Sequence, residues 1–374
     1  MPPPRRPALR ARREVLAALL AAAGAGALPR TAAALPPVAL RFPRDLGAHP
    51  DFRTEWWYIT GHATAGGRPF GFQLTFFRSR IAGTQALASR LAARQLLFAH
   101  AALTDLQGRR LLHDQRIARW NGTAATGGPA EAATDDMRVR IGDWSLARGT
   151  DGLYRARLPA DGFALELDFA ETQPLLLQGD AGLSRKGPEA RQASYYYSLP
   201  QLAPRGALVL DGRRVALDAP SPRTGAAWFD HEWSDELLAT GAVGWDWIGI
   251  NLFDGSALTA FRLRSREGGT VWTGGSWRPA GGALQVFGNG DVAFVPGRRW
   301  TSPHTGAAYP VEWQVRTPAG RFVLAALQDD QELDSRSSTG AVYWEGVSDL
   351  RASDGTPVGR GYLEMTGYLE TLRL

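Results

Sequence analysis

The chain has 374 residues, no cysteine and a formal net charge of +5. The absence of cysteine excludes a disulfide framework, a thiolate nucleophile and cysteine-ligated zinc. The arrangement of the basic residues argues against a nucleic-acid partner. All of them except Lys186 are arginines, and along the predicted strands they are scattered without a basic run or an aromatic stacking pattern.

Residues 1–34 have the charged, apolar and small-residue order of an export signal. Five arginines precede an apolar run that starts at Val15, and Thr31-Ala-Ala-Ala34 resembles a cleavage site. The pair Arg12-Arg13 fits a twin-arginine signal. A membrane anchor needs roughly 20 apolar residues, and this run is shorter and interrupted by glycine. We therefore expect a cleaved signal peptide and a periplasmic or secreted protein.

After residue 37 the pattern predicts strands rather than helices. In Glu55–His62, Trp56 and Tyr58 share one face, while Trp57 lies on the other. Further aromatic runs separated by Gly, Asp and Asn turns continue to the C-terminus. The chain therefore reads as all-β.

An internal repeat suggests two barrels. Trp56-Trp-Tyr-Ile59 and a later Phe77-Arg-Ser-Arg80 are echoed by Trp245-Asp-Trp-Ile248 and Phe261-Arg-Leu-Arg264. Two copies of a β-unit favour two tandem antiparallel barrels, since closure removes exposed edge strands. The Pro-rich stretch 218–225 is the expected boundary, which gives one barrel over residues 35–222 and a second over residues 223–374.

The stretch 226–255 concentrates tryptophans, acids and one histidine. On a strand, Asp230 and Glu232 share a face with Trp228, and His231 lies on the opposite face. Charged groups seldom enter a core unless they are paired, whereas acids among indoles are typical of a dry pocket that shifts a carboxyl pKa. This stretch is therefore the first candidate for a site.

Six motifs occur in order along the chain: Trp57–Gly61, Tyr195–Ser198, Trp228–Trp233, Gly244–Trp247, Tyr343–Gly346 and Gly359–Tyr368. They resemble the signatures of AttH-like secreted proteins, relatives of the carotenoid 1,2-hydratase (hydroxyneurosporene synthase) family. The resemblance covers roughly residues 45 to 370. The resemblance implies two lipocalin-like β-barrels, in agreement with the repeat. It also implies an activity that is labelled hydratase in some members and hydrolase in others.

The candidate chemistry is protonation of an alkene by a buried acid. Desolvation keeps such an acid protonated, and indole faces stabilise the cation by about 2 kcal/mol each when water is excluded. We expect Asp246 to be the acid, with His231 orienting it or activating water. Asp230 and Glu232 are further catalytic candidates. The family's functional His-x-Trp matches His231-Glu-Trp233, but its further acid has no clean counterpart here.

The remaining site candidates would bind substrate. Trp233, Trp245 and Trp247 are expected to form an aromatic wall. Tyr343, Glu345, Tyr362, Glu364 and Tyr368 share strand faces that either line the pocket or lie on an exposed side of a barrel. His62 and His100 are interpreted as core histidines. The full set of predicted binding residues is Trp57, Tyr58, Tyr196, Trp233, Trp245, Trp247, Trp344, Glu345, Tyr362 and Glu364.

Three functions remain open. The first is a cofactor-independent hydratase or lyase acting on an apolar, isoprenoid- or lipid-like substrate; the others are a secreted hydrolase of esters or lactones and a non-catalytic carrier of apolar ligands. Export argues slightly for the second or third. No metal is expected, because His231-Glu-Trp-Ser-Asp235 lacks the second histidine of a metalloprotease motif. The expected partner is an apolar small molecule or lipid, and a peripheral contact with a membrane is allowed.

Overall fold

The computed structural model describes residues 34–89, 92–121 and 128–372. The export signal predicted for residues 1–34 lies outside the described residues except for its last residue. Among the residues that are described, no helix is both long and apolar enough to cross a membrane. The only helices in these ranges are two 3₁₀ turns, η1 (Arg44–Leu46) and η2 (Ala82–Thr84).

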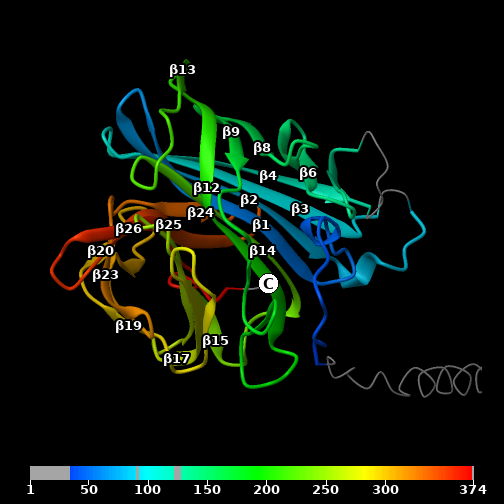
Figure 1. Cartoon of the computed structure of the whole chain (residues 1–374). Coiled ribbons are helices and arrows are strands. Elements are labelled where there is room, and N and C mark those ends of the chain that lie inside the picture. Colours follow the sequence, from blue (N-terminus) through cyan, green and yellow to red (C-terminus); the bar gives the residue numbers. More distant parts are fainter. Residues whose placement is uncertain (1–33, 90–91, 122–127, 373–374) are drawn as a thin grey trace, which may run out of the picture. The chain divides into compact units, whose positions relative to one another are not determined.

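The first sheet is antiparallel and contains fourteen strands (Figure 1). Its order is β4 (Arg110–Trp120), β3 (Gln95–Asp105), β2 (Arg68–Arg80), β1 (Thr54–Ala65), β14 (Gly225–Glu236), β12 (Ala193–Leu210), β9 (Phe163–Ala170), β8 (Tyr154–Ala160), β7 (Trp144–Arg148), β6 (Arg138–Ile141) and β5 (Ala130–Ala132). The short strands β10 (Leu176–Leu177), β11 (Leu183–Arg185) and β13 (Arg213–Ala216) also pair with β12. The two ends of the sheet meet, because β4 contacts β5 and β6.

The second sheet is built from the C-terminal part of the chain. Its order is β18 (Gln285–Phe287), β17 (Thr270–Arg278), β16 (Ala257–Ser265), β15 (Ala242–Leu252), β26 (Pro357–Met365), β25 (Ala341–Arg351), β23 (Gly320–Ala326), β22 (Glu312–Thr317) and β19 (Ala293–Pro296). Strand β24 (Glu332–Ser335) pairs with β25, and β20 (Arg299–Thr301) pairs with β21 (Ala308–Pro310). The predicted all-β class with two lipocalin-like barrels is confirmed.

The change from one sheet to the other falls between β14 and β15. Strand β14 lies after the expected boundary at residue 222, yet it pairs with β1 and β12 in the first sheet. The Pro-rich stretch 218–225 is therefore a connection within the first barrel rather than a link between barrels. The physical reason is that Phe229 and Trp233 are needed in the first core, where they are fully buried.

Each barrel has its own apolar core. The first contains Trp57, Phe229 and Trp144, and the second contains Ile248 and Trp313. The alternation predicted for 228–233 is confirmed, since Phe229 and Trp233 face the first core. A barrel filled in this way cannot bind a ligand in its centre, so any binding site has to lie elsewhere.

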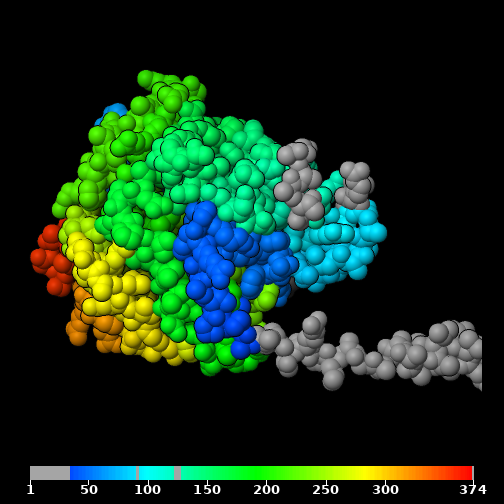
Figure 2. Space-filling view, turned by 45° about the vertical axis from the view of Figure 1, so that its right-hand side comes forward, coloured from blue at the N-terminus to red at the C-terminus, as the bar shows by residue number. Residues whose placement is uncertain are grey.

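The segment after residue 34 covers part of the first barrel. In Figure 2 it crosses the surface formed by the green strands. The Tyr195 hydroxyl donates to the Pro36 carbonyl at 2.6 Å, and the Phe42 ring lies 5.1 Å from the Tyr197 ring. The Trp57 indole N–H donates to the Leu46 carbonyl at 3.0 Å. This segment is thus anchored by both hydrogen bonds and ring contacts.

The two sheets pack closely because glycines stand at the points of contact. A Cβ at Gly71 of β2 would lie 2.8 Å from both the Val347 side chain and the Tyr362 hydroxyl. A Cβ at Gly249 of β15 would lie 3.2 Å from the Trp228 ring. Any larger residue at these positions would force the two barrels apart.

We predict that Gly71→Ala lowers the free energy of unfolding by about 1–3 kcal/mol, because the added methyl group meets the branched carbon of Val347. The matched control is Gly83→Ala, where a Cβ has no neighbour within 4 Å. That control should stay within about 0.5 kcal/mol of the parent. Urea unfolding measures both, and equal effects of the two substitutions would contradict the close packing.

Candidate active site

A cavity of about 200 Å³ lies between the two sheets. Strands β1, β2, β3, β12 and β14 contribute one wall, and β15, β16, β25 and β26 contribute the other. Its aromatic lining includes Trp56, Phe77, Phe98, Trp245, Trp247 and Phe261. Its polar lining includes Tyr58, His100, Lys186, Tyr196, Asp230, Glu232, Tyr343, Glu345 and Glu364. Glu55 and Arg78, which form an ion pair with each other, also border the cavity. The site is thus a largely apolar chamber bordered by five acids.

Two of these acids form a pair. Glu345 of β25 and Glu364 of β26 stand directly opposite each other on the same sheet face. Burial raises the pKa of Glu345 well above its ordinary value, and the neighbouring Glu364 raises it further. Burial also raises the pKa of Glu364 to about 7, against a hydrogen bond from Trp245. Two carboxylates on directly opposite strand positions, one buried and one half-buried in an apolar cavity, repel each other, so the pair holds a proton near neutral pH.

Tyr58 lies beside the pair. Within the described residues, its buried hydroxyl and the Oε1 atom of Glu345 make no hydrogen bond of normal geometry, but the two side chains lie close enough for each to shift the pKa of the other. Burial raises the pKa of Tyr58 well above its usual value, and the charges of the two glutamates add to the rise. Unpartnered buried polar atoms are uncommon in folded proteins and often mark functional positions.

The Asp230 carboxylate, by contrast, accepts three hydrogen bonds. Its Oδ1 accepts from Ser198 at 2.5 Å and from the Trp228 indole at 2.7 Å, and its Oδ2 accepts from the Tyr196 hydroxyl at 2.8 Å. Burial raises the pKa of Asp230 to about 7, although these three donors oppose the rise. Its carboxylate form is therefore prepared to accept a proton close to neutral pH.

Glu232 is paired with the single lysine. The Lys186 ammonium lies 2.9 Å from Oε1 of Glu232, and Ser194 donates to the same oxygen. The ammonium also lies 4.8 Å over the Tyr196 ring and 4.3 Å over the Phe261 ring. This pair gives the cavity one fixed positive charge beside an aromatic wall.

His100 forms hydrogen bonds both with a residue that lines the cavity and with a half-buried hydroxyl group. Its Nδ1 lies 2.8 Å from the Tyr343 hydroxyl, and its Nε2 lies 2.9 Å from the half-buried Ser338 hydroxyl. Burial lowers the pKa of His100 to about 3, so the ring is neutral. The sequence predicted a core histidine here; it is buried as expected, but it also lines the cavity.

The structure does not place Asp246 at the cavity, which corrects the expectation for this residue. Asp246 lies on β15 between Trp245 and Trp247, and since side chains alternate along a strand it points away from them. Its Oδ2 accepts from Arg262 at 2.6 Å, and its Oδ1 accepts from Tyr368 at 2.8 Å. Both carboxylate oxygens are therefore engaged by side chains outside the cavity, and Asp246 cannot reach a substrate there.

His231 is likewise not at the cavity, so the expected pairing with Asp246 is also corrected. It lies inside the first barrel, where the Trp57 ring stacks on it at 4.8 Å. Its Nε2 lies 3.0 Å from Oε1 of Glu55, and its Nδ1 lies 2.9 Å from the Tyr197 hydroxyl. Burial lowers the pKa of His231 to about 4, so the ring is neutral at physiological pH.

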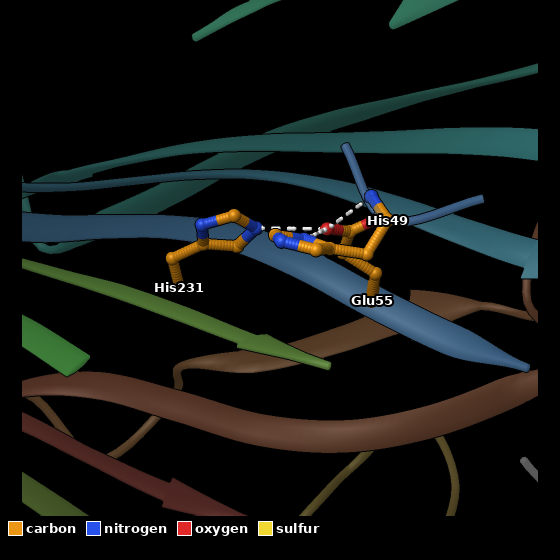
Figure 3. Close-up of side chains that lie close together, drawn as sticks. All are labelled: His49, Glu55 and His231. Atoms are coloured by element: carbon orange, nitrogen blue, oxygen red, sulfur yellow. Dashed lines mark hydrogen bonds and ion pairs between the residues drawn. The ribbon is translucent and has the colours of Figure 1, made fainter. Parts of the chain in front are cut away.

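Figure 3 shows His49, Glu55 and His231 with their hydrogen bonds converging on the Glu55 carboxylate. These are the described residues close enough to share a metal ion. Arg78 occupies the other oxygen of Glu55 at 2.7 Å. Burial alone would raise the pKa of Glu55, but Arg78 and the two histidines lower it well below its usual range. With every oxygen engaged and an arginine alongside, the donor set fits a structural network better than a metal centre.

The other predicted binding residues divide mainly by strand parity, with Tyr362 as the exception because it shares a strand face with Glu364. Tyr58, Tyr196, Trp245, Trp247, Glu345 and Glu364 line the cavity. Four others do not. Trp57 and Trp233 are in the first core, Trp344 is in the second core, and Tyr362 packs between the sheets beside Gly71.

Several lining residues were not in the predicted set, and some were detectable. Trp56 shares its strand face with Tyr58, so parity alone would have indicated it. Lys186 and Phe261 could not be found this way, because only the tertiary fold brings the segment after β11 and strand β16 to the same cavity.

Known proteins share the sequence pattern and the fold of this chain. The family model described as AttH-like matches residues 33–368. The chain belongs to the AttH-like family. A crystal structure of an AttH protein from Nitrosomonas europaea is 46% identical, with a TM-score of 0.80 over 90% of this chain and 99% of that one. Kievitone hydratase from Nectria haematococca is 15% identical, with a TM-score of 0.66 over 88% of this chain and 93% of its own. No curated protein matches the chain.

We predict that Arg78→Leu destabilises this AttH-like protein by about 3–5 kcal/mol, because it removes the cation from the buried Glu55 carboxylate. The control is Arg214→Leu, which breaks an exposed ion pair with Glu166 and should cost less than about 1 kcal/mol. Urea unfolding at pH 7 separates the two. A small effect of Arg78→Leu would show that the network is not structural.

A second prediction concerns pH. The folded pKa of Glu364, about 7, exceeds its ordinary value of 4.5, so the unfolded chain ionises first as pH rises. Glu364 therefore costs no stability below pH 4.5, and about 3 kcal/mol above pH 7.

Replacing the group should remove this cost. We expect Glu364→Gln to gain stability relative to the parent as pH rises from 4.5 to 8, measured by urea unfolding across that range. The exposed Glu370→Gln serves as the control and should show no such trend. A gain that is independent of pH would mean that Glu364 is already ionised in the folded protein.

Proposed function

We propose that the protein is a hydratase, or catalyses the reverse elimination, on an alkene carried by an apolar substrate. The observation that carries the proposal is the pair formed by the buried Glu345 and the half-buried Glu364, which faces a chamber of indoles. Water addition to an unactivated alkene needs a carboxylic acid that is still protonated near neutral pH. The pair supplies such an acid through burial and mutual repulsion.

In the first step the protonated member of the pair transfers its proton to one alkene carbon. A C–H bond forms, the π bond breaks, and the other carbon becomes a cation. Trp56, Trp245 and Trp247 line the cavity and would stabilise this cation by about 2 kcal/mol each in the absence of water. The pair is left with one more negative charge, which also favours the cation.

In the second step water adds to the cation and loses a proton. Asp230 is the base best suited to receive it, because its three donors favour the carboxylate. The C–O bond forms, the proton goes to Asp230, and transfer of that proton back to the glutamate pair restores the starting state. The sum is alkene plus water giving a tertiary alcohol, with no electrons gained or lost.

Kievitone hydratase, which shares the fold, is named for a hydration. That name agrees with the proposed reaction class, but the substrate of the present protein is argued only from the cavity. A carrier of apolar ligands would have the same aromatic walls, although it would have no need of three acids with raised pKa values. Those acids cost stability, and their retention favours catalysis over carriage.

The test is incorporation of ¹⁸O from labelled water into a panel of prenylated phenols and prenyl alcohols, followed by mass spectrometry. We expect label in the parent protein and a loss of at least about 100-fold in Glu345→Gln and Glu364→Gln. The rate should also fall as pH rises past about 7, because the pair then loses its proton.

The matched control is Glu332→Gln. Glu332 is also buried, but it accepts from Ser302 and Thr305 away from the cavity. This variant should retain the parent rate. Ligand binding without label incorporation in the parent would identify a carrier, and full activity of both pair variants would exclude the proposed acid.

A further inference from the structure

A second cavity, of about 210 Å³, lies beside the first. It is formed where the excursion that contains β10 and β11 meets β16, β17 and β18 of the second sheet. Apolar side chains such as Leu183, Trp272 and Phe287 form much of its surface, with Val286 at its exposed rim. The acids of the proposed reaction do not line it.

Asp180 and Arg185 lie at the exposed edge of this second cavity, and its two side-chain amides are already engaged by the protein. Gln178 accepts from Ser276 at 2.7 Å and donates to Ser198 at 2.9 Å. Asn289 accepts from the backbone N–H of Thr273 at 3.0 Å. Because these amides are used, what the cavity offers a ligand is chiefly apolar surface.

The two cavities share two lining residues, Tyr196 and Phe261. Tyr196 is fixed, since its hydroxyl donates to Asp230 at 2.8 Å and accepts from the Trp247 indole at 3.3 Å. Phe261 has no directional bond. Its ring is held by the Lys186 ammonium 4.3 Å away and by packing against the opposite strand.

The residue opposite Phe261 explains how the ring fits. Phe261 pairs with Gly274 across β16 and β17. A Cβ at Gly274 would lie 2.8 Å from two carbon atoms of the Phe261 ring. A glycine at this position therefore leaves the space that the ring occupies, and the ring stands between the two cavities.

We propose that the second cavity is a subsite for the apolar tail of the ligand whose reacting end lies in the first cavity, and that Phe261 limits the length of that ligand. The proposal rests on the proposed function only for the identity of the reacting end. The apolar lining and the shared wall carry the rest. The ligand class is thus an elongated hydrocarbon chain with one polar or reactive end.

The experiment uses a series of saturated linear alcohols from about 6 to about 16 carbon atoms, which cannot react, with affinities measured by calorimetry. For the parent, Kd should fall about three- to fourfold per methylene until the chain reaches Phe261, and then level off. In Phe261→Ala the fall should continue, so that the longest alcohols bind at least about tenfold more tightly than to the parent. The shortest should change by no more than about threefold.

Two further variants complete the test. Phe98→Ala enlarges the first cavity without touching the second, and it should leave the length at which affinity levels off unchanged. Adding Val286→Trp to Phe261→Ala narrows the second cavity and should restore the parent limit. An equal effect of Phe261→Ala on all chain lengths, or a gain that survives Val286→Trp, would overturn the proposal, as would absence of binding at every length.

These outcomes are separate from those of the hydration experiment. If the protein binds alcohols with the expected length limit but incorporates no label, the tail subsite is supported and the hydratase assignment is wrong. Label incorporation together with a chain-length limit that does not depend on Phe261 would support the hydratase assignment and overturn the tail subsite.

Discussion

The exclusion of water between the two sheets is the constraint on which the site depends. Gly71 and Gly249 allow the sheet faces to approach, and the indoles of Trp228 and Trp247 fill much of the remaining space. Glu345 is consequently buried and Glu364 opposite it is half-buried, and neither has a cationic partner among the described residues. Their raised pKa values are a result of packing, and would vanish if the sheets separated.

Strand alternation divides the acids of this protein into two classes. Glu55 and Asp246 point into the barrels, and each is paired with an arginine that stands opposite on the next strand, Arg78 or Arg262. Asp230, Glu345 and Glu364 point into the space between the barrels. The first class is stabilised as carboxylate and supports the fold, and the second is destabilised as carboxylate and is available for proton transfer. Each barrel thus contains an ion pair of this kind, although the repeat aligns Asp246 with Trp57 rather than with Glu55.

Much of this arrangement could be predicted from the sequence, because it depends on local periodicity. The two-barrel class followed from the repeat, and the opposite faces of Asp230 and His231 followed from alternation. The same rule would have turned Asp246 away from its flanking tryptophans. The prediction failed there because nearness in sequence to Trp245 and Trp247 was taken for nearness in space.

Other features were beyond the sequence for physical reasons. Glu345 and Glu364 were predicted to share strand faces, but their direct opposition depends on the register of β25 and β26. The role of Phe261 depends on Gly274 across the next strand and on Lys186 from the other barrel's sheet. Register and contacts between sheets are set by the whole core rather than by any one segment.

The packed apolar cores of both barrels affect how the ligand specificity of such a protein can change in evolution. A single barrel that binds its ligand internally can change specificity only by altering the residues that also hold it together. Here the chamber lies between two barrels that each have a core of their own, so its lining can vary while each core keeps its packing. A duplicated fold of this kind separates the residues that confer stability from those that select the molecule to be transformed.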